Sequence, residues 1–357
     1  MTESTSSLAR SSDVEVAPGR VVQTPVLVPS LSSKGFAPVE IEERAVPAPA
    51  AYLELLGTAL TDGLLISSFD IHYGQLERDG LVANFSTSPY ARPALLIVDS
   101  GWYEARLWAD VGEPYEDARE AQPWHYEDFE AVVESLDSEM SAVLVNWDAE
   151  HPSRGQPSYE EQIARAQEFF EKHSRFRSDF LLKPERMSKW HHFDKLVPHA
   201  ARLKAFDIVG VTEKELGDTI TDRLVALAYL RRAMDEARVH RPIHVFGGLD
   251  PLYTPLYFAA GAEVFDGLSW LRYSYSDGLA VYREAEILMK EQFDKRFPLA
   301  LGSIQLANLD VLRKLTGDLK VFASRGSDWS VLPNGELLRR AYVRMEAALQ
   351  MGGGRGT

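Results

Sequence analysis

Short, unbroken apolar runs alternate along the chain with longer stretches in which apolar residues recur at helical spacing. The runs, rich in Val, Ile, Leu and Phe, are Leu64–Phe69, Ala94–Val98, Ala142–Trp147, Asp179–Leu182, Phe206–Val211, Ile243–Phe246 and Val264–Leu268, with a less clear eighth at Leu299–Ile304. Unbroken runs are typical of parallel strands that are buried on both faces. The pattern therefore predicts an α/β fold with a parallel sheet.

The segments between the runs predict helices. Tyr159–His173 and Thr221–Ala237 are amphipathic, and Ser158 with Glu161 forms the sequence signature of a capping box. About eight strand–helix repeats favour a (β/α)8 TIM barrel, although an open doubly wound sheet gives the same alternation. We expect one barrel domain over residues 13–349 with an N-terminal β-hairpin extension, a disordered N-terminus at 1–12 and a flexible tail at 350–357.

Composition narrows the range of functions. The 357-residue chain has no cysteine, which excludes disulfides, thiolate metal sites and thiol catalysis. No apolar run reaches the roughly 18 residues of a membrane span, and residues 1–10 lack the pattern of a secretory signal. We therefore expect a cytoplasmic protein that does not bind membranes.

The net charge of −15 would repel a polyanion unless a local basic patch offsets it. One candidate patch comprises Arg175, Arg177, Lys183, Arg186 and Lys189, which can equally be solvated surface charges.

Polar residues follow the apolar runs, at the strand ends that open on the catalytic face of a parallel barrel. Asp70, Asp99, Asp148, Lys183, Thr212 with Glu213, and Gly247 with Gly248 follow the first six runs, and Asp266 lies inside the seventh. An Asp after a strand is often only a helix cap. Asp266, however, stands in an apolar stretch, where an unpaired carboxylate is costly, so a function is favoured. Several carboxylates at one mouth would have divergent pKa values, which suits acid–base and nucleophilic roles.

Several segments in collinear order resemble motifs of the tRNA-guanine transglycosylase family. Gly19–Pro29 resembles the family's opening hairpin and Thr-Pro segment, and Ile97–Glu104 resembles its Asp-Ser-Gly-Gly-Phe/Tyr-Gln motif. Trp147-Asp148 resembles the family's Phe-Asp pair, and Phe206–Gly210 resembles its strand ending in Gly-Gly. Gly261–Asp266 resembles the motif that holds the nucleophile, and Leu306–Leu309 resembles the late His-Asn-Leu helix start. The resemblance covers most of the chain and implies a TIM barrel that exchanges a purine base in a nucleic acid.

The resemblance also implies a role for each matching residue. Asp266 would be the nucleophile that displaces guanine and forms a covalent glycosyl-enzyme, and Asp99 the general acid and base. The matching substrate-binding positions are Ser100, Tyr103, Asp148, Gly210 and Gly248, with Asp148 on the donor edge of the base, Tyr103 stacked on its face and Gly210 offering backbone. The partners would be tRNA or DNA and a free purine-type base, such as a 7-deazapurine of the queuosine type.

This chain departs from the family pattern in its metal site and its base pocket. The family's structural zinc needs three Cys and one His, so no zinc site and no other cofactor is expected here; the adjacent His191 and His192 do not replace it. Trp102 stands at the second Gly of the Asp-Ser-Gly-Gly motif, Glu104 at its Gln, and Lys183 in the region of the family's Gln-Gly-Gly segment.

These departures leave three alternatives open. The protein can be a non-catalytic subunit of a nucleic-acid modification complex, acting with a protein partner or as a homodimer. It can act on a free nucleoside rather than a polymer. Without the resemblance, it can be a retaining glycoside hydrolase whose Trp102, Trp108, Trp147 and Trp270 stack on sugar.

Overall fold

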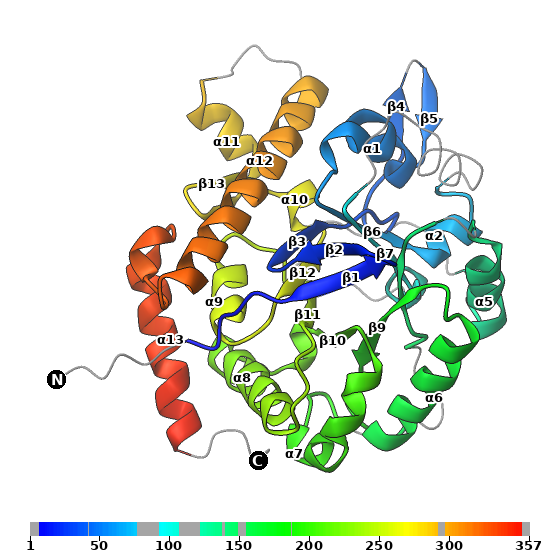
Figure 1. Cartoon of the computed structure of the whole chain (residues 1–357). Coiled ribbons are helices and arrows are strands. Elements are labelled where there is room, and N and C mark those ends of the chain that lie inside the picture. The colour runs from blue at the N-terminus through cyan, green and yellow to red at the C-terminus, as the bar shows by residue number, and fades with distance from the viewer. Residues whose placement is uncertain are drawn as a thin grey trace.

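Eight parallel strands form the centre of the molecule (Figure 1). The computed structural model describes residues 7–41, 43–76, 93–106, 122–137, 140–148, 155–186, 188–291 and 297–351. In their order around the sheet, the strands are β3 (Val26–Pro29), β12 (Val264–Gly267), β11 (Ile243–Phe246), β10 (Ile208–Thr212), β9 (Arg177–Leu182), β8 (Val143–Val145), β7 (Leu95–Asp99) and β6 (Gly63–Ser67).

The two edge strands of this sheet meet, so the sheet is a nearly closed barrel. Ser30, next to β3, forms a parallel bridge with Leu65 of β6. The backbone N–H of Leu31 also donates to the carbonyl of Leu65 at 2.9 Å. The predicted (β/α)8 TIM-barrel fold is confirmed.

Seven of the eight predicted strands lie where the apolar runs placed them, but the eighth is wrong. The missing strand is β3, whereas Leu299–Ile304 belongs to the long helix α12 (Phe297–Ser324). Leu312, Leu315 and Leu319 are buried on one side of this helix, at the spacing of three and four residues that a helix face requires. A window of six residues was too short to show this period.

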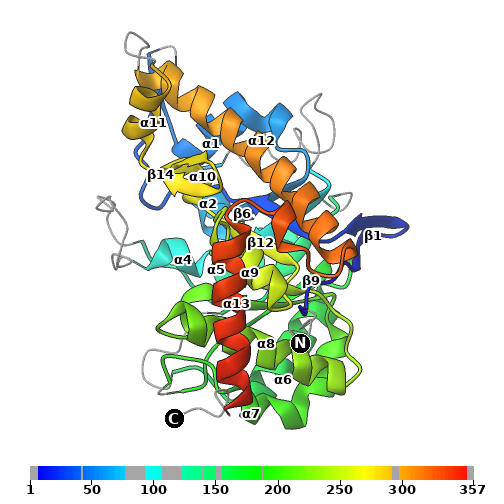
Figure 2. The ribbon, with the colours of Figure 1, turned by 90° about the vertical axis from the view of Figure 1, so that its left-hand side faces the viewer.

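Helices cover the outside of the barrel, and both predicted amphipathic helices are confirmed as α6 (Tyr159–Lys172) and α8 (Ile220–Glu236). The Ser158 hydroxyl accepts the N–H of Glu161, which is half of the expected capping box. The other helices are α1 (Ala48–Leu56), α2 (Ser68–His72), α4 (Trp102–Ala105), α5 (Tyr126–Ser135), α7 (Phe193–Leu196), α9 (Tyr253–Ala259), α10 (Ser269–Arg272), α11 (Arg283–Met289) and α13 (Gly335–Gln350). Figure 2 shows α12 and α13 together on one flank. Among the described residues, no helix is both long and apolar enough to cross a bilayer.

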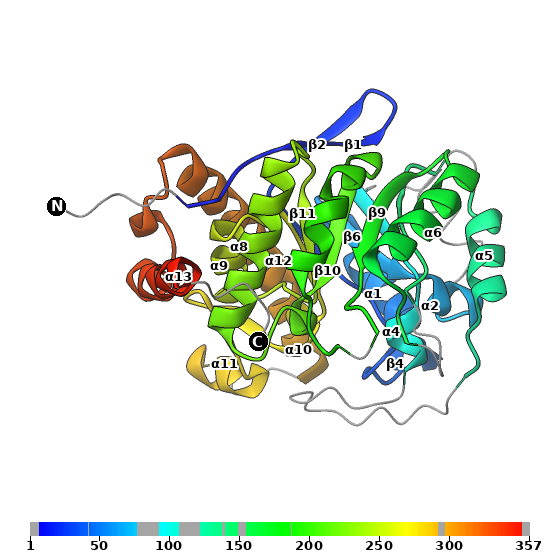
Figure 3. The same ribbon diagram turned by 90° about the horizontal axis from the view of Figure 1, so that it is seen from below.

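The predicted N-terminal hairpin, β1 (Asp13–Ala17) with β2 (Arg20–Gln23), covers one end of the barrel. Val14 and Val16 pack against the interior residues Val26 and Val264 near the strand starts. Figure 3 shows this hairpin at one end and α4 and α10 at the other. The strand C-termini therefore open at the end opposite the hairpin. Two further hairpins, β4 (Val39–Ile41) with β5 (Arg44–Val46) and β13 (Ser274–Ser276) with β14 (Leu279–Val281), lie outside the barrel.

The expected disorder of residues 1–12 is wrong for residues 7–12. The N–H of Leu8 donates to the carbonyl of Ala259 at 2.9 Å, and the Arg10 guanidinium binds both carboxylate oxygens of Asp235 at 2.8 and 2.7 Å. These partners lie more than 200 residues away, so the local sequence gave no sign of them. Residues 1–6, and residues 352–357 of the expected tail, lie outside the described residues.

Candidate active site

Three ionisable side chains meet inside the otherwise apolar barrel. Side chains alternate between the two faces of a strand, so positions two residues from the interior residues Leu181, Phe246 and Val264 also point inward. These positions hold Asp179 of β9, His244 of β11 and Asp266 of β12. Nδ1 of His244 lies 2.6 Å from Oδ2 of Asp179, and Nε2 lies 3.2 Å from Oδ1 of Asp266.

The carboxylates on both sides of His244 favour its charged form. Burial by itself lowers the pKa of this imidazole, but Asp179, and after it Asp266, raise the pKa to about 9. His244 and Asp179 are fully buried, and Asp266 is 7% exposed. Burial also raises the pKa of Asp179, although its contact with His244 lowers it in part. The geometry therefore favours a charged imidazole between two acidic side chains.

Gly210 lies on β10, between the strands that carry Asp179 and His244. A Cβ at this position would stand 2.5 Å from Cε2 of Phe246 and 3.0 Å from Oδ1 of Asp179. Its backbone runs within the ladder between β9 and β11. That Gly210 offers backbone to a base stays a prediction; what the structure shows is that the missing side chain leaves room for Asp179 to reach His244.

Two further donors hold the carboxylate of Asp266. The Ser30 hydroxyl donates to Oδ2 at 2.7 Å, and the backbone N–H of Gly247 donates to Oδ1 at 3.0 Å. The neighbouring Gly248 was expected to bind substrate, but its N–H donates to Val245 and its carbonyl accepts the Thr254 hydroxyl. Gly247, rather than Gly248, thus contributes to the site.

Asp99 ends β7 at the mouth of the barrel. Gly101 follows with a φ of 82°, and a Cβ there would lie 2.6 Å from the backbone nitrogen of Phe69, so the turn requires glycine. The N–H of Gly101 donates to Oδ2 of Asp99 at 3.2 Å. Burial, then the charges of Asp148, Glu104 and Asp266, raise the pKa of Asp99 well above its usual value. Asp99 is therefore close enough to both other predicted acids to sense their charges.

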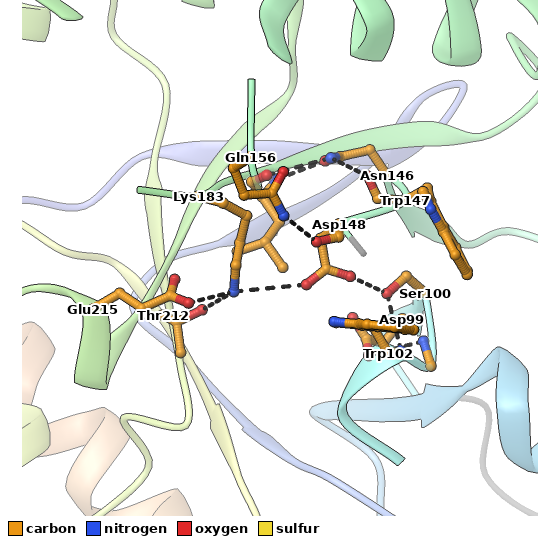
Figure 4. Close-up of polar contacts among 12 residues, drawn as sticks. Asp99, Ser100, Trp102, Asn146, Trp147, Asp148, Gln156, Lys183, Thr212 and Glu215 are labelled. Atoms are coloured by element: carbon orange, nitrogen blue, oxygen red, sulfur yellow. Dashed lines mark hydrogen bonds and ion pairs between the residues drawn. The ribbon is translucent and has the colours of Figure 1, made fainter. Parts of the chain in front are cut away.

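Asp148 follows β8 at the same mouth, between a hydroxyl and an ammonium group (Figure 4). The Ser100 hydroxyl donates to Oδ1 of Asp148, and Nζ of Lys183 lies 3.7 Å from Oδ2. The same ammonium lies 2.7 Å from Oε1 of Glu215 and donates to the Thr212 hydroxyl at 3.2 Å. Ser100, expected to bind substrate, is fully buried and orients Asp148.

Lys183 keeps its charge in this partly buried position. Burial lowers the pKa of the ammonium, but the charges of Glu215 and Asp148 raise it by more. The pKa of Lys183 therefore lies above its usual value. The mouth therefore presents a cation beside the carboxylate of Asp148.

Aromatic side chains near these acids differ from the expectation. Tyr103 was predicted to stack on the purine, but the Lys34 ammonium lies 4.1 Å from the centre of its ring and occupies one face. Trp102 follows in the same turn as Asp99 and Ser100, its N–H donates to the Ser100 hydroxyl at 3.3 Å, and its ring lies 6.0 Å from that of Trp147. Trp102 is therefore a second aromatic side chain in the turn after β7.

Other residues singled out from the sequence serve the fold. Asp70 is buried and accepts both the N–H and the hydroxyl of Ser33. Glu213 pairs with Arg223 and Tyr257. Trp270 is fully buried, while Trp108 lies outside the described residues. Asn308, from the presumed late motif, lies within α12 and binds the backbone of Trp270 and Tyr273.

The candidate basic patch is not one surface. Arg175 binds the carbonyls of Val133 and Leu136, and Arg177 pairs with Glu15 of the hairpin, both near the start of β9. Lys183 lies beyond the other end of the same strand.

Within the described residues, no group of three or more His, Asp or Glu side chains is arranged to hold a metal ion. His191 is buried and stacks on Phe193, with ring centres 4.7 Å apart. No protein-family model matches the chain, and the search of curated proteins finds no match either.

We expect Gly210→Ala to destabilise the protein by about 1–3 kcal/mol, because its methyl group would displace Phe246 or Asp179. Gly317→Ala in α12 is the matched control, because nothing lies within 4 Å of a Cβ there. Urea unfolding followed by circular dichroism measures both. Equal midpoints for the two variants would contradict the tight packing around Gly210.

We expect Lys183→Met to destabilise the protein by about 3–5 kcal/mol, because Asp148 and Glu215 would lose their shared cation. Lys189→Met removes an exposed lysine whose partner Asp218 is also exposed, so its unfolding midpoint should stay at the wild-type value. A Lys183→Met midpoint as high as that of the control would show that the ammonium is not needed at the mouth.

Proposed function

We propose that the protein is a base-exchange N-glycosyltransferase that replaces a purine, with guanine as the leaving base, by a deazapurine-type base in tRNA or DNA. The observation that carries the proposal is that three acids chosen from the sequence motifs lie toward the same end of the barrel: Asp99 ends β7, Asp148 follows β8 and Asp266 lies near the end of β12. The resemblance to tRNA-guanine transglycosylases supplies the reaction, and these positions are consistent with it.

In the first half-reaction, Oδ2 of Asp266 attacks the anomeric carbon of the nucleotide. The bond between this carbon and the base nitrogen breaks, its electron pair leaves with the base, and protonated Asp99 gives the base its proton. A carbon–oxygen bond to Asp266 now holds the sugar, as in retaining glycosidases. The raised pKa of Asp99 supports this role, because the acid must carry a proton near neutral pH.

In the second half-reaction, the entering base attacks the same carbon. Asp99, now ionised, accepts the proton from the attacking ring nitrogen, and the carbon–oxygen bond returns its electron pair to Asp266. The same carboxyl group thus serves as acid and then as base, and no net proton is gained or lost.

The base is held by an acceptor and a donor side by side. Asp148 accepts hydrogen bonds from N–H groups of the base edge, and the ammonium of Lys183 can donate to a carbonyl oxygen on the same edge. A charge-assisted bond of this kind contributes roughly 1.5–3 kcal/mol. Guanine carries both features on one edge, which supports it as the leaving base.

We expect Asp266→Ala to abolish base exchange and the covalent adduct, since no other carboxylate in the described part of the chain takes the same contacts. The measurement incubates the pure protein with tRNA or DNA and labelled guanine, then reads incorporation and the protein mass after denaturation. Asp70→Asn is the control, because that buried carboxylate binds only within the fold, and it should retain exchange if folded. Exchange by Asp266→Ala at the wild-type rate would refute the nucleophile, and absence of exchange in wild type would favour a non-catalytic subunit.

A nucleoside-level glycosidase is the second candidate, favoured by the net charge of −15 and by the separation of the candidate basic residues. Salt dependence distinguishes the two. Polynucleotide affinity should fall about tenfold or more between 50 and 200 mM salt, because bound phosphates release counterions, whereas nucleoside affinity should stay nearly constant. Competition binding with tRNA, DNA and guanosine at both salt concentrations gives the answer, and a salt-independent affinity for guanosine alone would select the second candidate.

A further inference from the structure

We propose that Asp179 and His244 are positioning residues that hold a positive charge against Oδ1 of Asp266 and thereby make Oδ2 the nucleophilic atom. This inference rests on the proposed function and goes beyond it. Neither residue belongs to a motif that suggested the reaction, and their role follows from contacts inside the barrel.

The first step is the division of contacts between the two oxygens of Asp266. Oδ1 has both the N–H of Gly247 at 3.0 Å and Nε2 of His244 at 3.2 Å, whereas the one partner of Oδ2 among the described residues is the Ser30 hydroxyl at 2.7 Å. A carboxylate oxygen has two lone pairs, so Oδ2 retains one for attack on carbon. Both contacts on Oδ1 come from β11 or its end, which is rigidly paired with β12.

The second step is the nature of the contact between His244 and Asp266. Nε2 does not form a well-directed hydrogen bond, although it lies within ion-pair distance of Oδ1. The Asp179 carboxylate, in contrast, takes Nδ1 at 2.6 Å and thus fixes the orientation of the ring. The ring also stacks on Phe246, with centres 3.8 Å apart, so it cannot turn freely. His244 therefore acts on Asp266 mainly through its charge.

The third step is the effect of this charge on the two half-reactions. When Oδ2 bonds to the sugar, Asp266 becomes a neutral ester whose carbonyl oxygen is Oδ1. When the entering base breaks that bond, negative charge returns to the carboxylate, and the imidazolium stabilises it as it leaves. The cation makes Asp266 a better leaving group, so its loss should slow breakdown of the covalent adduct more than its formation.

The charged groups that face His244 among the described residues are Asp179 on β9 and Asp266 on β12, with Asp99 acting on Asp266 from β7. All three are carboxyl groups. The imidazolium is therefore kept by its surroundings, and its raised pKa of about 9 agrees with that geometry.

The test begins with an NMR titration of protein labelled with ¹⁵N-histidine, which needs no substrate. The His244 signal is identified by its loss in His244→Gln. We expect it to titrate near 9 in the wild type. In Asp179→Asn the midpoint should fall by more than about one pH unit, because an opposite charge in contact is lost. Glu263→Gln is the control, since Glu263 is equally buried next to β12 but binds Thr24, and it should leave the midpoint unchanged.

The activity arm uses the same variants with tRNA or DNA and labelled guanine. Asp179→Asn and His244→Gln should slow adduct breakdown about tenfold or more and raise the trapped fraction of glycosyl-enzyme, while Glu263→Gln should not. A His244 midpoint below about 7 in folded wild-type protein, or one that Asp179→Asn does not move, would overturn the proposal. Asp266→Asn gives a second measurement of the midpoint if Asp179→Asn fails to fold.

The two arms separate the inference from the proposed function. If His244 titrates as expected but no base exchange occurs, the base-exchange function fails and the buried imidazolium stands as a structural fact. If base exchange occurs and adduct breakdown is the same in His244→Gln and wild type, the function stands and the positioning role fails.

Discussion

The site depends on the cost of placing charge inside a closed barrel. An ionised carboxylate loses several kcal/mol of hydration on burial, so it must find partners or take up a proton. Asp266 has such partners, because the imidazole of His244, a hydroxyl and a backbone N–H surround its carboxyl group. Asp99 has acidic neighbours instead, and burial together with their charges raises its pKa well above the usual value.

In the proposed reaction, this difference gives two similar residues different roles. Both are aspartates at the carboxyl ends of barrel strands, and nothing in their own side chains distinguishes an acid from a nucleophile. The neighbours on adjacent strands make the distinction, because β11 supplies a cation to β12 whereas β8 supplies an anion to β7. The order of strands around the barrel is therefore part of the chemistry.

The sequence predicted the barrel and the three acids for different reasons. Buried parallel strands have unbroken apolar runs, which is why seven strands could be located. The eighth, β3, was missed because its segment, Gly19–Pro29, was assigned by its resemblance to a family motif and was not counted as an apolar run. Asp266 was found because a carboxylate in an apolar run is costly. The same argument applies to Asp179 and His244, which stand within the runs of β9 and β11, and it would have identified them had each run been searched for ionisable residues.

Other parts of the site could not be predicted from local sequence. The contacts of Asp148 with Lys183, and of Lys183 with Glu215, join residues on successive strand ends, and the register between strands determines which side chains meet. A glycine in the sequence shows only that there is no room for a side chain, and not why. The role predicted for Gly210 therefore came from its motif alone. Whether the space serves a ligand or a neighbouring residue depends on the next strand, where Phe246 fills it.

Two departures from the family pattern that the sequence resembles, Trp102 and Lys183, lie at the mouth of the barrel. Trp102 and Lys183 stand where the resemblance leads one to expect small or neutral groups, and they add an aromatic side chain in the turn after Asp99 and a cation 3.7 Å from Oδ2 of Asp148. The ammonium of Lys183 also offsets the cost of burying the carboxylate of Asp148, and it pairs with Glu215 at the same time. Replacing Lys183 by a neutral residue would therefore require a compensating change at Glu215.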